Sequence, residues 1–593
     1  MGITTLLRGV IRIRVIKKTP ILSLISVLLM SACTWSNPVD TAMIPMRDRI
    51  KLSTVFIFPP AKQTQYPVVL IRTPYQKERL APHYQFLVES GYVVAIQDVR
   101  GRFESEGTFE PFVKEGPDGY DAIEWIASQP WCNGNIGMIG SSYDGWVQYC
   151  AAVEKPPHLK TIIPNCAMPD LFYELPYRCG VFVPASLLWA QIVEENATSD
   201  LSGKKIEAIY SRPWITLLNH LPVSDLDSVV LGEKVPYYGR WIQHETKDAY
   251  WTQCATIEKL SAVKIPVFIQ SGWFDAQLLG SKMAYNALTG SGNQQVKMVL
   301  GPWGHVDKES KYYQGKFIGE AADDIDLHGL YREWFDYWLK GEENGIMETP
   351  RVQLYALQAD TWFSGNEYPL SSTTFHKLYL RPSDPGRFPQ GGALLPHYPS
   401  NLSKNDREFV GSYTYDPVNV VAFGKEEGRD IAGFIDRLEG RSDYLFYQSA
   451  PLTEQTTLLG PLSATLYASS SAKDTDWFVL LFSIPPDGGV IQNISYGLLR
   501  AKFRTGFTTP ELLQPNEIYR FDIDLNQCGI TLAKGGKMGL IITSSCFFPY
   551  FSKNLNTGQN SQTTTSMCVA EQKIYLSKEY PSHITFPVIV SHP

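Results

Sequence analysis

A serine between small residues marks the first place in the chain where residue types and spacing suggest chemistry. The apolar run Ile136–Ile139 leads directly into the hexapeptide Gly-Ser-Ser-Tyr-Asp-Gly at positions 140–145. A serine on a sharp turn from a strand into a helix exposes its hydroxyl, and it needs small neighbours because the helix starts close to the strand end. The second glycine stands one position later than in the strict Gly-x-Ser-x-Gly pattern, so Ser142 taken alone fits a plain turn as well as a nucleophile.

Two later residues supply what a nucleophilic serine needs. Asp275 follows the apolar segment Val267–Gln270, and His305 follows the next such segment, Lys297–Leu300. The chain order Ser, Asp, His, with each residue just after a strand, is typical of α/β-hydrolases. The carboxyl ends of parallel strands gather at one edge of the sheet, where such sheets carry their active sites. Taken singly, Asp275 fits a helix cap and His305 a loop histidine, but the three residues together predict a catalytic triad.

A triad of this kind implies two-step acyl transfer. His305 would take the proton of Ser142 as the hydroxyl attacks a carbonyl carbon, Asp275 would orient the imidazole, and water would then release the acyl group. The backbone N–H of Tyr143 would face the developing oxyanion. These steps need no cofactor, and the sequence contains no CxxC motif or Cys/His cluster that would predict a structural metal site.

The segments around these residues predict the sheet that would carry them. Near-continuous apolar runs indicate parallel strands covered on both faces, and the helical spacing within Asp118–Ala127 indicates a crossover helix. Such a βαβ series predicts an α/β sheet. The strands expected in the first part of the chain are Val68–Ile71, Tyr92–Ile96, Ile136–Ile139 and Thr161–Ile163.

Composition shifts along the chain predict three regions beyond this first series. Residues 169–262 carry helical stretches with scattered tryptophans, which predicts a helical cap inserted into the α/β domain. The strand pattern then resumes and ends with the amphipathic segment Leu327–Leu339, so the α/β-hydrolase domain is expected at 45–168 and 263–341. After the polar linker Glu342–Thr349, short strands between Gly, Pro and Asn turns, Arg351–Ala356 first, predict an all-β sandwich over 350–593.

The first 32 residues have the composition of a secretory signal. Five basic residues precede the apolar stretch Ile21–Met30, and the small residues Ser31 and Ala32 lead to Cys33. This layout resembles a bacterial lipobox, in which the cysteine is lipidated; an ordinary signal peptide with an incidental cysteine is the alternative. The apolar stretch is too short to favour a spanning helix. We therefore expect export, either as a lipoprotein anchored to the membrane of the cell envelope through Cys33 or as a periplasmic or secreted protein.

The charge balance excludes one class of partner. The chain of 593 residues has a net charge of −7, and without residues 1–32 its 48 basic residues face 60 acidic ones, a net charge of −12. Nucleic-acid binding relies on clustered positive charge, so nucleic acid is not expected as a partner. A small-molecule ester or amide, or a short peptide, is the expected substrate, and the oligomeric state stays open.

Taken together, the motifs resemble those of the CocE/NonD hydrolases of the X-Pro dipeptidyl-peptidase class, which include cocaine esterase, glutaryl acylases and α-amino-acid ester hydrolases. The resemblance runs from about residue 45 to the C-terminus and implies a C-terminal jelly-roll domain. It also implies that the phenol of Tyr75 donates to the oxyanion beside the Tyr143 N–H. The motif Asp98–Arg102, which contains acidic and basic residues, is interpreted as structural, bracing the loops around the sheet. The motifs that carry the resemblance are Arg72–Tyr75, Asp98–Arg102, Gly140–Gly145, Gly272–Asp275, Gly301–His305, Asp474–Asp476, Pro486–Gly488 and Gly497–Ala501.

One departure from this family bears on the substrate. In α-amino-acid ester hydrolases, carboxylates just after the triad aspartate help to hold the substrate ammonium, whereas Ala276–Leu278 (Ala-Gln-Leu) follow here. Aromatic residues of the cap, and Trp273 with Trp303, are expected to form two walls that suit an uncharged or aromatic group, unless they only fill the interior. An esterase or acylase is the leading interpretation. An X-Pro dipeptidyl-peptidase is the alternative enzyme, and a surface-anchored binding protein is the alternative of another class.

Overall fold

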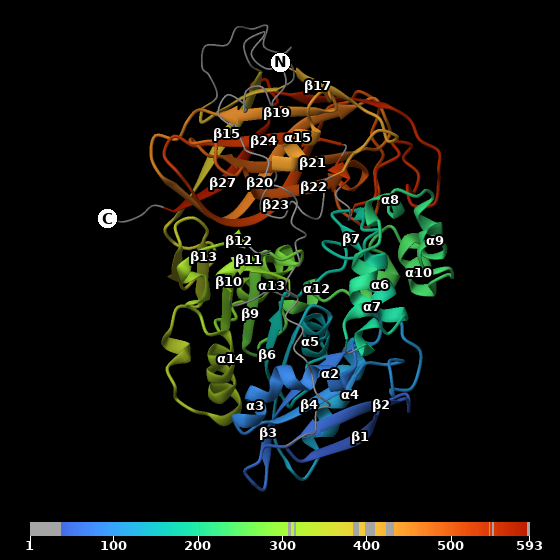
Figure 1. The fold of residues 1–593 in the computed structure, drawn as a ribbon, viewed down its shortest axis with the longest axis vertical. Coiled ribbons are helices and arrows are strands. Elements are labelled where there is room, and N and C mark those ends of the chain that lie inside the picture. Colours follow the sequence, from blue (N-terminus) through green and yellow to red (C-terminus); the bar gives the residue numbers. More distant parts are fainter. Residues whose placement is uncertain are drawn as a thin grey trace.

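Two units are stacked along the long axis of the molecule, an α/β unit with a helical cap beside it and a C-terminal β unit (Figure 1). The predicted signal segment 1–32 and Cys33 lie outside the described residues. Within the part of the chain that is described, no helix combines the length and the apolar character needed to cross a membrane. The computed structural model describes residues 37–200, 202–305, 310–313, 316–382, 391–397, 410–422, 432–544, 546–547 and 551–589.

The α/β unit is built on a mixed sheet that contains ten strands over the described residues, in the order β1-β2-β4-β3-β5-β6-β9-β10-β13-β14. Neighbours are parallel from β4 to β13 and antiparallel at both edges. The predicted parallel α/β sheet is therefore confirmed. The strands are β1 Val39–Pro45, β2 Lys51–Ile57, β3 Tyr66–Thr73, β4 Val93–Asp98, β5 Cys132–Ser141, β6 Leu159–Asn165, β9 Val267–Phe274, β10 Val296–Gly304, β13 Val352–Ala356 and β14 Thr361–Gly365.

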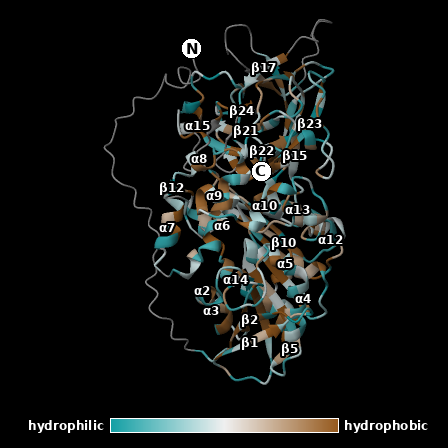
Figure 2. Ribbon diagram, turned by 90° about the vertical axis from the view of Figure 1, so that its right-hand side faces the viewer, coloured by the Kyte–Doolittle hydropathy of each residue, from teal (hydrophilic) through white to brown (hydrophobic). Residues whose placement is uncertain are grey.

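Side chains alternate along each central strand between two helical layers. Val68 and Leu70 of β3 belong to the core shared with α4, α5 and α13, whereas Val69 and Ile71 belong to the core shared with α3 and α14. Because both faces are covered, these strands read as continuous apolar runs. Figure 2 shows hydrophobic residues gathered around α5 and β10 inside this unit. The helices are α2 Lys77–Leu80, α3 Gln85–Glu89, α4 Glu115–Ala127, α5 Tyr143–Val153, α13 Leu278–Gly290 and α14 Leu327–Phe335, with 3-10 turns at Ala81–Tyr84, Glu320–Asp323 and Ile346–Glu348, a π-helical turn at Asp336–Lys340 and the hairpin β11 Tyr312–Tyr313 and β12 Lys316–Phe317.

The strand expected to open the C-terminal β domain belongs instead to the α/β sheet. β13 pairs in parallel with β10, with Val352 opposite Met298 and Leu354 opposite Leu300, and β14 follows it as an antiparallel edge. Val352 and Leu354 are fully buried. The prediction was wrong here because the sequence of a short apolar strand does not indicate which sheet the strand joins. Its packing against β10 determines the sheet.

The cap lies between β6 and β9 in the chain and fills the space beside the sheet and below the β unit (Figure 1). Its helical character confirms the predicted insertion. Trp241 and Trp251 are fully buried, so these tryptophans pack the interior of the cap. The elements are β7 Tyr177–Arg178, β8 Val181–Phe182, α6 Ser186–Glu194, α7 Lys204–Tyr210, α8 Trp214–Leu217, α9 Leu226–Leu231, α10 Pro236–Gln243, α11 Ala249–Thr252 and α12 Ile257–Leu260, with 3-10 turns at Ala197–Ser199 and Val223–Asp225.

The C-terminal unit is a mostly antiparallel β domain, which confirms its predicted all-β class. Over the described residues its main sheet runs β17-β26-β20-β27-β15-β16-β19-β24-β21-β22, with β23 on β20; β16 and β19 pair in parallel. The elements are β15 Thr373–Pro382, β16 Gly391–Leu395, β17 Val410–Tyr415, β18 Val421–Ala422, α15 Ala432–Arg437, β19 Tyr444–Ser449, β20 Thr456–Ser470, β21 Asp476–Ile484, β22 Gln492–Arg500, a 3-10 turn Ala501–Phe503, β23 Tyr519–Leu532, β24 Lys537–Thr543, β25 Cys546–Phe547, β26 Ala570–Tyr575 and β27 His583–Ile589.

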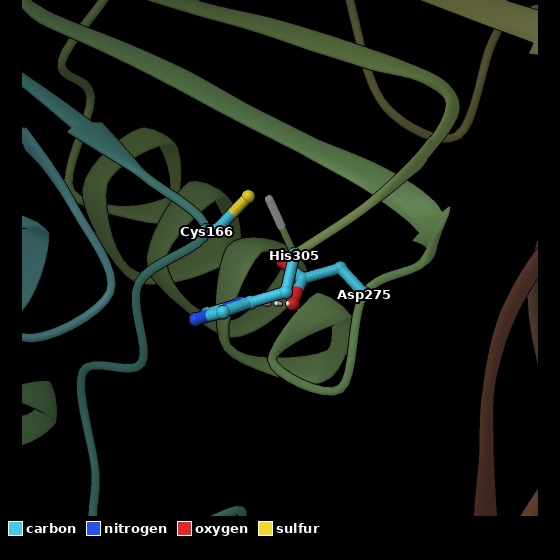
Figure 3. A group of neighbouring side chains, drawn as sticks. All are labelled: Cys166, Asp275 and His305. Carbon is cyan, nitrogen blue, oxygen red and sulfur yellow. Dashed lines mark hydrogen bonds and ion pairs between the residues drawn. The ribbon is translucent and has the colours of Figure 1, made fainter. Parts of the chain in front are cut away.

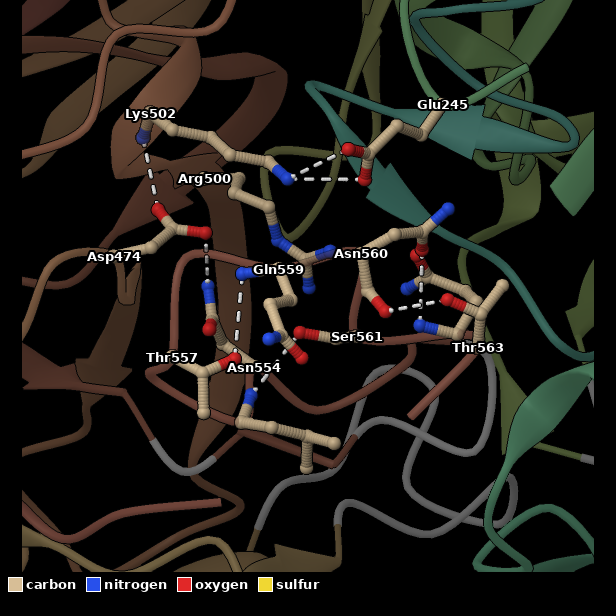
Figure 4. A network of polar contacts seen from close by, with 12 residues as sticks. Glu245, Asp474, Arg500, Lys502, Asn554, Thr557, Gln559, Asn560, Ser561 and Thr563 are labelled. Atoms are coloured by element: carbon tan, nitrogen blue, oxygen red, sulfur yellow. Dashed lines mark hydrogen bonds and ion pairs between the residues drawn. The ribbon is translucent and has the colours of Figure 1, made fainter. Parts of the chain in front are cut away.

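A buried polar network ties the β unit to the cap. Lys502 Nζ, on a side chain only 1% exposed, lies 2.9 Å from a carboxylate oxygen of Glu245 in the cap. The Lys502 backbone N–H donates to Asp474, whose other carboxylate oxygen accepts from Asn554. Figure 4 shows Lys502 reaching from the β unit to Glu245. The β unit therefore holds the cap in place from the side away from the α/β sheet.

Candidate active site

Ser142 occupies a strained turn between β5 and α5. Its φ of 64° and ψ of −123° lie in a region that L-residues rarely adopt, at a cost on the order of 1–3 kcal/mol. A Cβ at position 140 would lie 2.6 Å from the Cβ of Asp144, and one at position 145 would lie 2.8 Å from the carbonyl oxygen of Asn165. Position 145 therefore requires glycine on steric grounds, which explains the shifted pattern.

Asp275 and His305 are brought together by the register of two parallel strands. Phe274 ends β9 and Gly304 ends β10, and these two residues are paired across the sheet. The next residue on each strand thus faces the other, and His305 Nδ1 lies 2.8 Å from Asp275 Oδ1. Figure 3 shows the imidazole lying beside the carboxylate.

The Asp275 carboxylate is held ionised and oriented. It is buried, and it also accepts hydrogen bonds from the Ser271 hydroxyl at 2.7 Å and the Gln277 backbone N–H at 2.9 Å. Burial alone would raise the pKa of the carboxyl, but the charge of His305 and these hydrogen bonds lower that pKa to about 2. An ionised Asp275 accepts the Nδ1 proton, which leaves Nε2 of a neutral His305 as a proton acceptor.

The end of β6 connects the serine turn to the Asp275–His305 pair. The Ser142 backbone N–H donates to the carbonyl oxygen of Asn165 at 3.0 Å, and the N–H of the next residue, Cys166, donates to Gln270 of β9 at 2.7 Å. The Cys166 thiol, an Asp275 carboxylate oxygen and a His305 ring nitrogen all lie within 4.8 Å of one another (Figure 3). Cys166 is not among the site residues expected from the sequence, although it follows a strand end as Asp275 does.

Tyr75 lies two residues beyond β3 and meets the predicted nucleophile. Its phenol lies beside the Ser142 side chain and accepts the indole N–H of Trp189 at 2.8 Å. Burial, with the nearby Asp144, raises the pKa of Tyr75 well above its ordinary value, so the phenol keeps its proton at neutral pH and can donate. Tyr143 is the first residue of α5, so its backbone N–H has no acceptor within the helix.

A buried chain of polar side chains lies beneath the serine turn. The phenol O–H of Tyr143 donates to Glu115 Oε1 at 2.8 Å, and Glu115 Oε2 lies 2.7 Å from an Arg72 guanidinium nitrogen. Arg72 Nε then donates to Gln97, and Gln97 donates to Thr54 on β2. The turn is thus anchored to α4 and to three neighbouring strands.

The motif at 98–102 contacts the loop that carries Tyr75. Arg102 Nε donates to the Pro74 carbonyl oxygen at 3.0 Å, and another of its guanidinium nitrogens donates to Asn196 of the cap at 2.8 Å. Asp98 accepts from Lys77 at 3.0 Å. These contacts link the loop after β3 to the cap, which agrees with the interpretation of this motif as a brace.

Glu174 of the cap is a buried carboxyl beside the Asp275–His305 pair that the sequence analysis missed. Its carboxyl faces the first turn of α13, where the backbone N–H groups of Leu279 and Gly280 point toward it. Burial is the main reason that the pKa of Glu174 is raised to about 8. The charge of Arg178 acts against this rise, and the charge of Asp275 adds to it. A carboxyl that is uncharged at neutral pH therefore lies next to a carboxylate that is ionised.

The two aromatic walls expected from the sequence differ in where their tryptophans lie in the structure. Trp189 stacks at 12° on Tyr143 with ring centroids 6.0 Å apart, so the wall from the cap reaches the serine turn. Trp303 is 1% exposed and lies 5.7 Å from the Trp362 ring, whereas the indole N–H of Trp273 donates to the Tyr355 carbonyl oxygen. Trp303 therefore only fills the interior, whereas Trp273 is partly buried and its place in a second wall stays a prediction.

Comparisons with known proteins agree along nearly the whole chain. Residues 48–307 match the family described as X-Pro dipeptidyl-peptidase (S15 family), and residues 344–585 match the X-Pro dipeptidyl-peptidase C-terminal non-catalytic domain. Cocaine esterase of Rhodococcus sp. (strain MB1 Bresler) is 31% identical over 573 residues, 93% of this chain and 98% of that protein. An aminopeptidase from the marine sediment archaeon Thaumarchaeota archaeon is similar with a TM-score of 0.78 at 25% identity, over 93% of this chain and 97% of that one. A CocE/NonD family hydrolase from Staphylococcus aureus gives a TM-score of 0.67 at 20% identity, over 93% and 94%.

Proposed function

Because the chain belongs to the CocE/NonD family of serine hydrolases, we propose that it cleaves an ester or amide through a covalent acyl-enzyme on Ser142. The observation that carries this proposal is the 2.8 Å contact between His305 and Asp275 at the ends of two paired strands, at the same sheet edge as the strained Ser142. An ordinary loop aspartate and histidine would have no reason to pair at the edge that also carries a strained serine. A binding protein would need neither the strain nor the pair.

In the proposed mechanism, Nε2 of His305 takes the proton of Ser142 while the hydroxyl oxygen attacks the substrate carbonyl carbon. Asp275, ionised with a pKa of about 2, stabilises the imidazolium that forms. The imidazolium then gives its proton to the leaving alcohol or amine as the carbonyl re-forms. Water, deprotonated in turn by His305, hydrolyses the acyl-enzyme and regenerates Ser142.

The oxyanion of each tetrahedral intermediate would be held by two donors. Tyr75 supports this role because its phenol stays protonated and contacts Ser142, and the Tyr143 backbone N–H opens the helix that follows the nucleophile. Donors fixed in a largely buried site stabilise charge without reorganisation, and losing one typically costs about 2.7–4 kcal/mol. We therefore expect Tyr75→Phe to lower kcat by about a hundredfold or more.

For the substrate, we propose an uncharged acyl group of moderate size, with aromatic esters as the first class to test. Two observations support this choice: the aromatic wall that Trp189 forms beside the serine turn, and the cocaine esterase to which the chain is similar along its length. Ala276–Leu278 also provide no carboxylate after Asp275.

A second candidate, release of X-Pro dipeptides, is favoured by the position of Glu174. A dipeptidyl-peptidase must hold the free ammonium of its substrate, and Glu174 offers a buried carboxyl beside Asp275 that would ionise when a cation binds. Glu174→Gln separates the two candidates. For a dipeptidyl-peptidase it should raise KM for an X-Pro anilide by tenfold or more, and for an esterase it should leave KM for p-nitrophenyl benzoate unchanged.

The test of the proposed function is hydrolysis of p-nitrophenyl esters and X-Pro anilides by the protein from residue 34 onward. Ser142→Ala and His305→Ala should abolish turnover, and Asp275→Asn should lower kcat by about 10³–10⁴ because the imidazole loses its orienting partner. Ser141→Ala is the matched control, since it removes the adjacent hydroxyl from the end of β5 and should retain activity. A folded Ser142→Ala variant with wild-type turnover would exclude the proposal.

A further inference from the structure

A residue of the cap contacts the predicted oxyanion donor of the α/β unit. Trp189 lies on α6, and its indole Nε1 is 2.8 Å from the phenol oxygen of Tyr75 after β3, although the two residues are 114 positions apart. The cap is therefore joined to the reaction centre by a hydrogen bond as well as by packing.

The chemistry of the two groups fixes the direction of this hydrogen bond. An indole N–H can only donate, so Tyr75 Oη must be the acceptor in its contact with Trp189. A phenol has one proton, and that proton cannot point toward a donor. The phenol also lies beside the Ser142 side chain, so its O–H, kept away from the indole donor, can point to the carbonyl oxygen of a substrate bound at Ser142.

The Trp189 ring is itself held in place by aromatic neighbours. It stacks on Tyr143 at 6.0 Å and 12°, on Phe112 at 5.9 Å and 22°, and on Trp241 at 6.2 Å and 28°. Tyr143 also contributes the second proposed oxyanion donor, its backbone N–H. One indole ring therefore touches both residues of the oxyanion hole.

We propose that Trp189 is a positioning residue that aims the Tyr75 hydroxyl at the oxyanion, so that the cap completes the oxyanion hole. This inference rests on the proposed acyl transfer at Ser142. Without the indole N–H, the phenol proton can rotate toward other acceptors, and part of its alignment is lost before each turnover. The acceptor role also polarises the phenol O–H, since hydrogen bonds in a chain strengthen one another.

A different role for Trp189, as a wall that only contacts the substrate, predicts a different pattern. A wall affects KM most for bulky acyl groups and acts whether or not Tyr75 carries a hydroxyl. A positioning residue affects kcat for small and large acyl groups alike, and its effect disappears when the Tyr75 hydroxyl is absent. The two roles are therefore separable by a double-mutant cycle.

The experiment compares wild type, Trp189→Phe, Tyr75→Phe and the double variant on p-nitrophenyl acetate and p-nitrophenyl benzoate. Rates are divided by the number of active sites titrated to completion with a fluorophosphonate. We expect Trp189→Phe to lower kcat about fivefold to tenfold on both esters with KM unchanged, as one neutral hydrogen bond allows. We expect the double variant to be no slower than Tyr75→Phe alone.

Two further variants keep the test decisive if Trp189→Phe folds poorly. Trp189→His retains a ring N–H and should recover part of the lost kcat. Trp214→Phe removes another indole of the cap, whose N–H donates to the Ile209 carbonyl oxygen at 2.8 Å and not to Tyr75, and it should change kcat less than twofold.

Equal losses from Trp189→Phe with and without the Tyr75 hydroxyl, or a rise in KM confined to the benzoate, would overturn the proposal. So would a kcat that Trp189→Phe leaves unchanged. An inactive and unlabelled wild type would instead mean that the proposed function itself is wrong.

Discussion

The phenol O–H of Tyr143 donates a hydrogen bond of 2.8 Å to the buried carboxylate of Glu115. The first residue of the helix behind the predicted nucleophile is thereby fixed to α4, and through Glu115 to Arg72, which is fully buried. A nucleophile keeps a strained φ only if several surrounding contacts fix its position. The Glu115–Arg72 pair is placed to do this.

Glu115→Gln should destabilise the protein by about 3–5 kcal/mol, because it leaves the buried Arg72 guanidinium without a counter-charge. It should also lower kcat by about tenfold, since small displacements of a nucleophile are costly. The measurements are thermal unfolding and p-nitrophenyl ester turnover. Glu124→Gln on the same helix is the control, because its partly exposed pair with His158 should contribute no more than about 1 kcal/mol. Equal stability of the two variants would contradict the assigned role.

Glu174 should make the stability of the protein fall as pH rises from about 4.5 to about 8. Burial raises the pKa of this carboxyl from 4.5 to about 8 in the folded protein, so within this window the folded state holds a proton that the unfolded state has lost. The resulting cost, roughly 5 kcal/mol, is absent below pH 4.5 and fully present above pH 8.

Glu174→Gln removes this titration, so its melting temperature should decline less than that of wild type between pH 5.5 and pH 8.5. Glu207→Gln, at an exposed position of α7, should follow wild type. Parallel pH profiles for wild type and Glu174→Gln would show that the carboxyl is not buried as the structure has it.

The contact between Lys502 and Glu245 predicts that the cap loosens when the pair is broken. Glu245→Gln should weaken the packing of the cap on the β unit by about 3 kcal/mol, because the buried charge of Lys502 loses its partner carboxylate. Limited proteolysis within residues 169–262 should then accelerate, and Lys502→Met in the same variant should slow it again. Asp522→Asn breaks an exposed pair of the β unit and serves as the control. Unchanged cleavage in Glu245→Gln would contradict this role of the network.

Export with lipidation at Cys33 is a separate proposal that rests on the sequence alone. In a bacterial host, labelled palmitate should enter the full-length protein and not a Cys33→Ala variant, because the thiol is the acceptor. Cys568→Ala, which changes an exposed cysteine far along the chain, should label like wild type. Export without label in the full-length protein would favour an ordinary signal peptide.

Local patterns were sufficient to predict the sheet and to place Ser142, Asp275 and His305 directly after strands. Val68–Ile71 and Ile136–Ile139 are apolar because both faces of their strands are covered, and Asp275 and His305 follow strands whose carboxyl ends must share an edge. These inferences need only the period of a strand and the direction of the chain.

Contacts between distant segments could not be predicted in this way. Glu115 meets Tyr143, and Trp189 meets Tyr75, only after separate elements have packed, and nothing in the spacing of these residues signals the pair. The same reason explains the misassigned strand Val352–Ala356, whose partner β10 lies about fifty residues earlier, and the tryptophan of the second expected wall that packs against β14. Tertiary packing decided each case.

The most direct test of the central claim is peptide mapping by mass spectrometry after reaction with a fluorophosphonate. The account predicts one phosphonate per chain, attached to Ser142, with none in a folded Ser142→Ala variant and full labelling in Ser141→Ala. Because the reagent needs a hydroxyl activated by a neighbouring base, its attachment reports the Ser142–His305–Asp275 arrangement and not exposure alone. Attachment at another residue, or a folded wild type that stays unlabelled, would contradict the account.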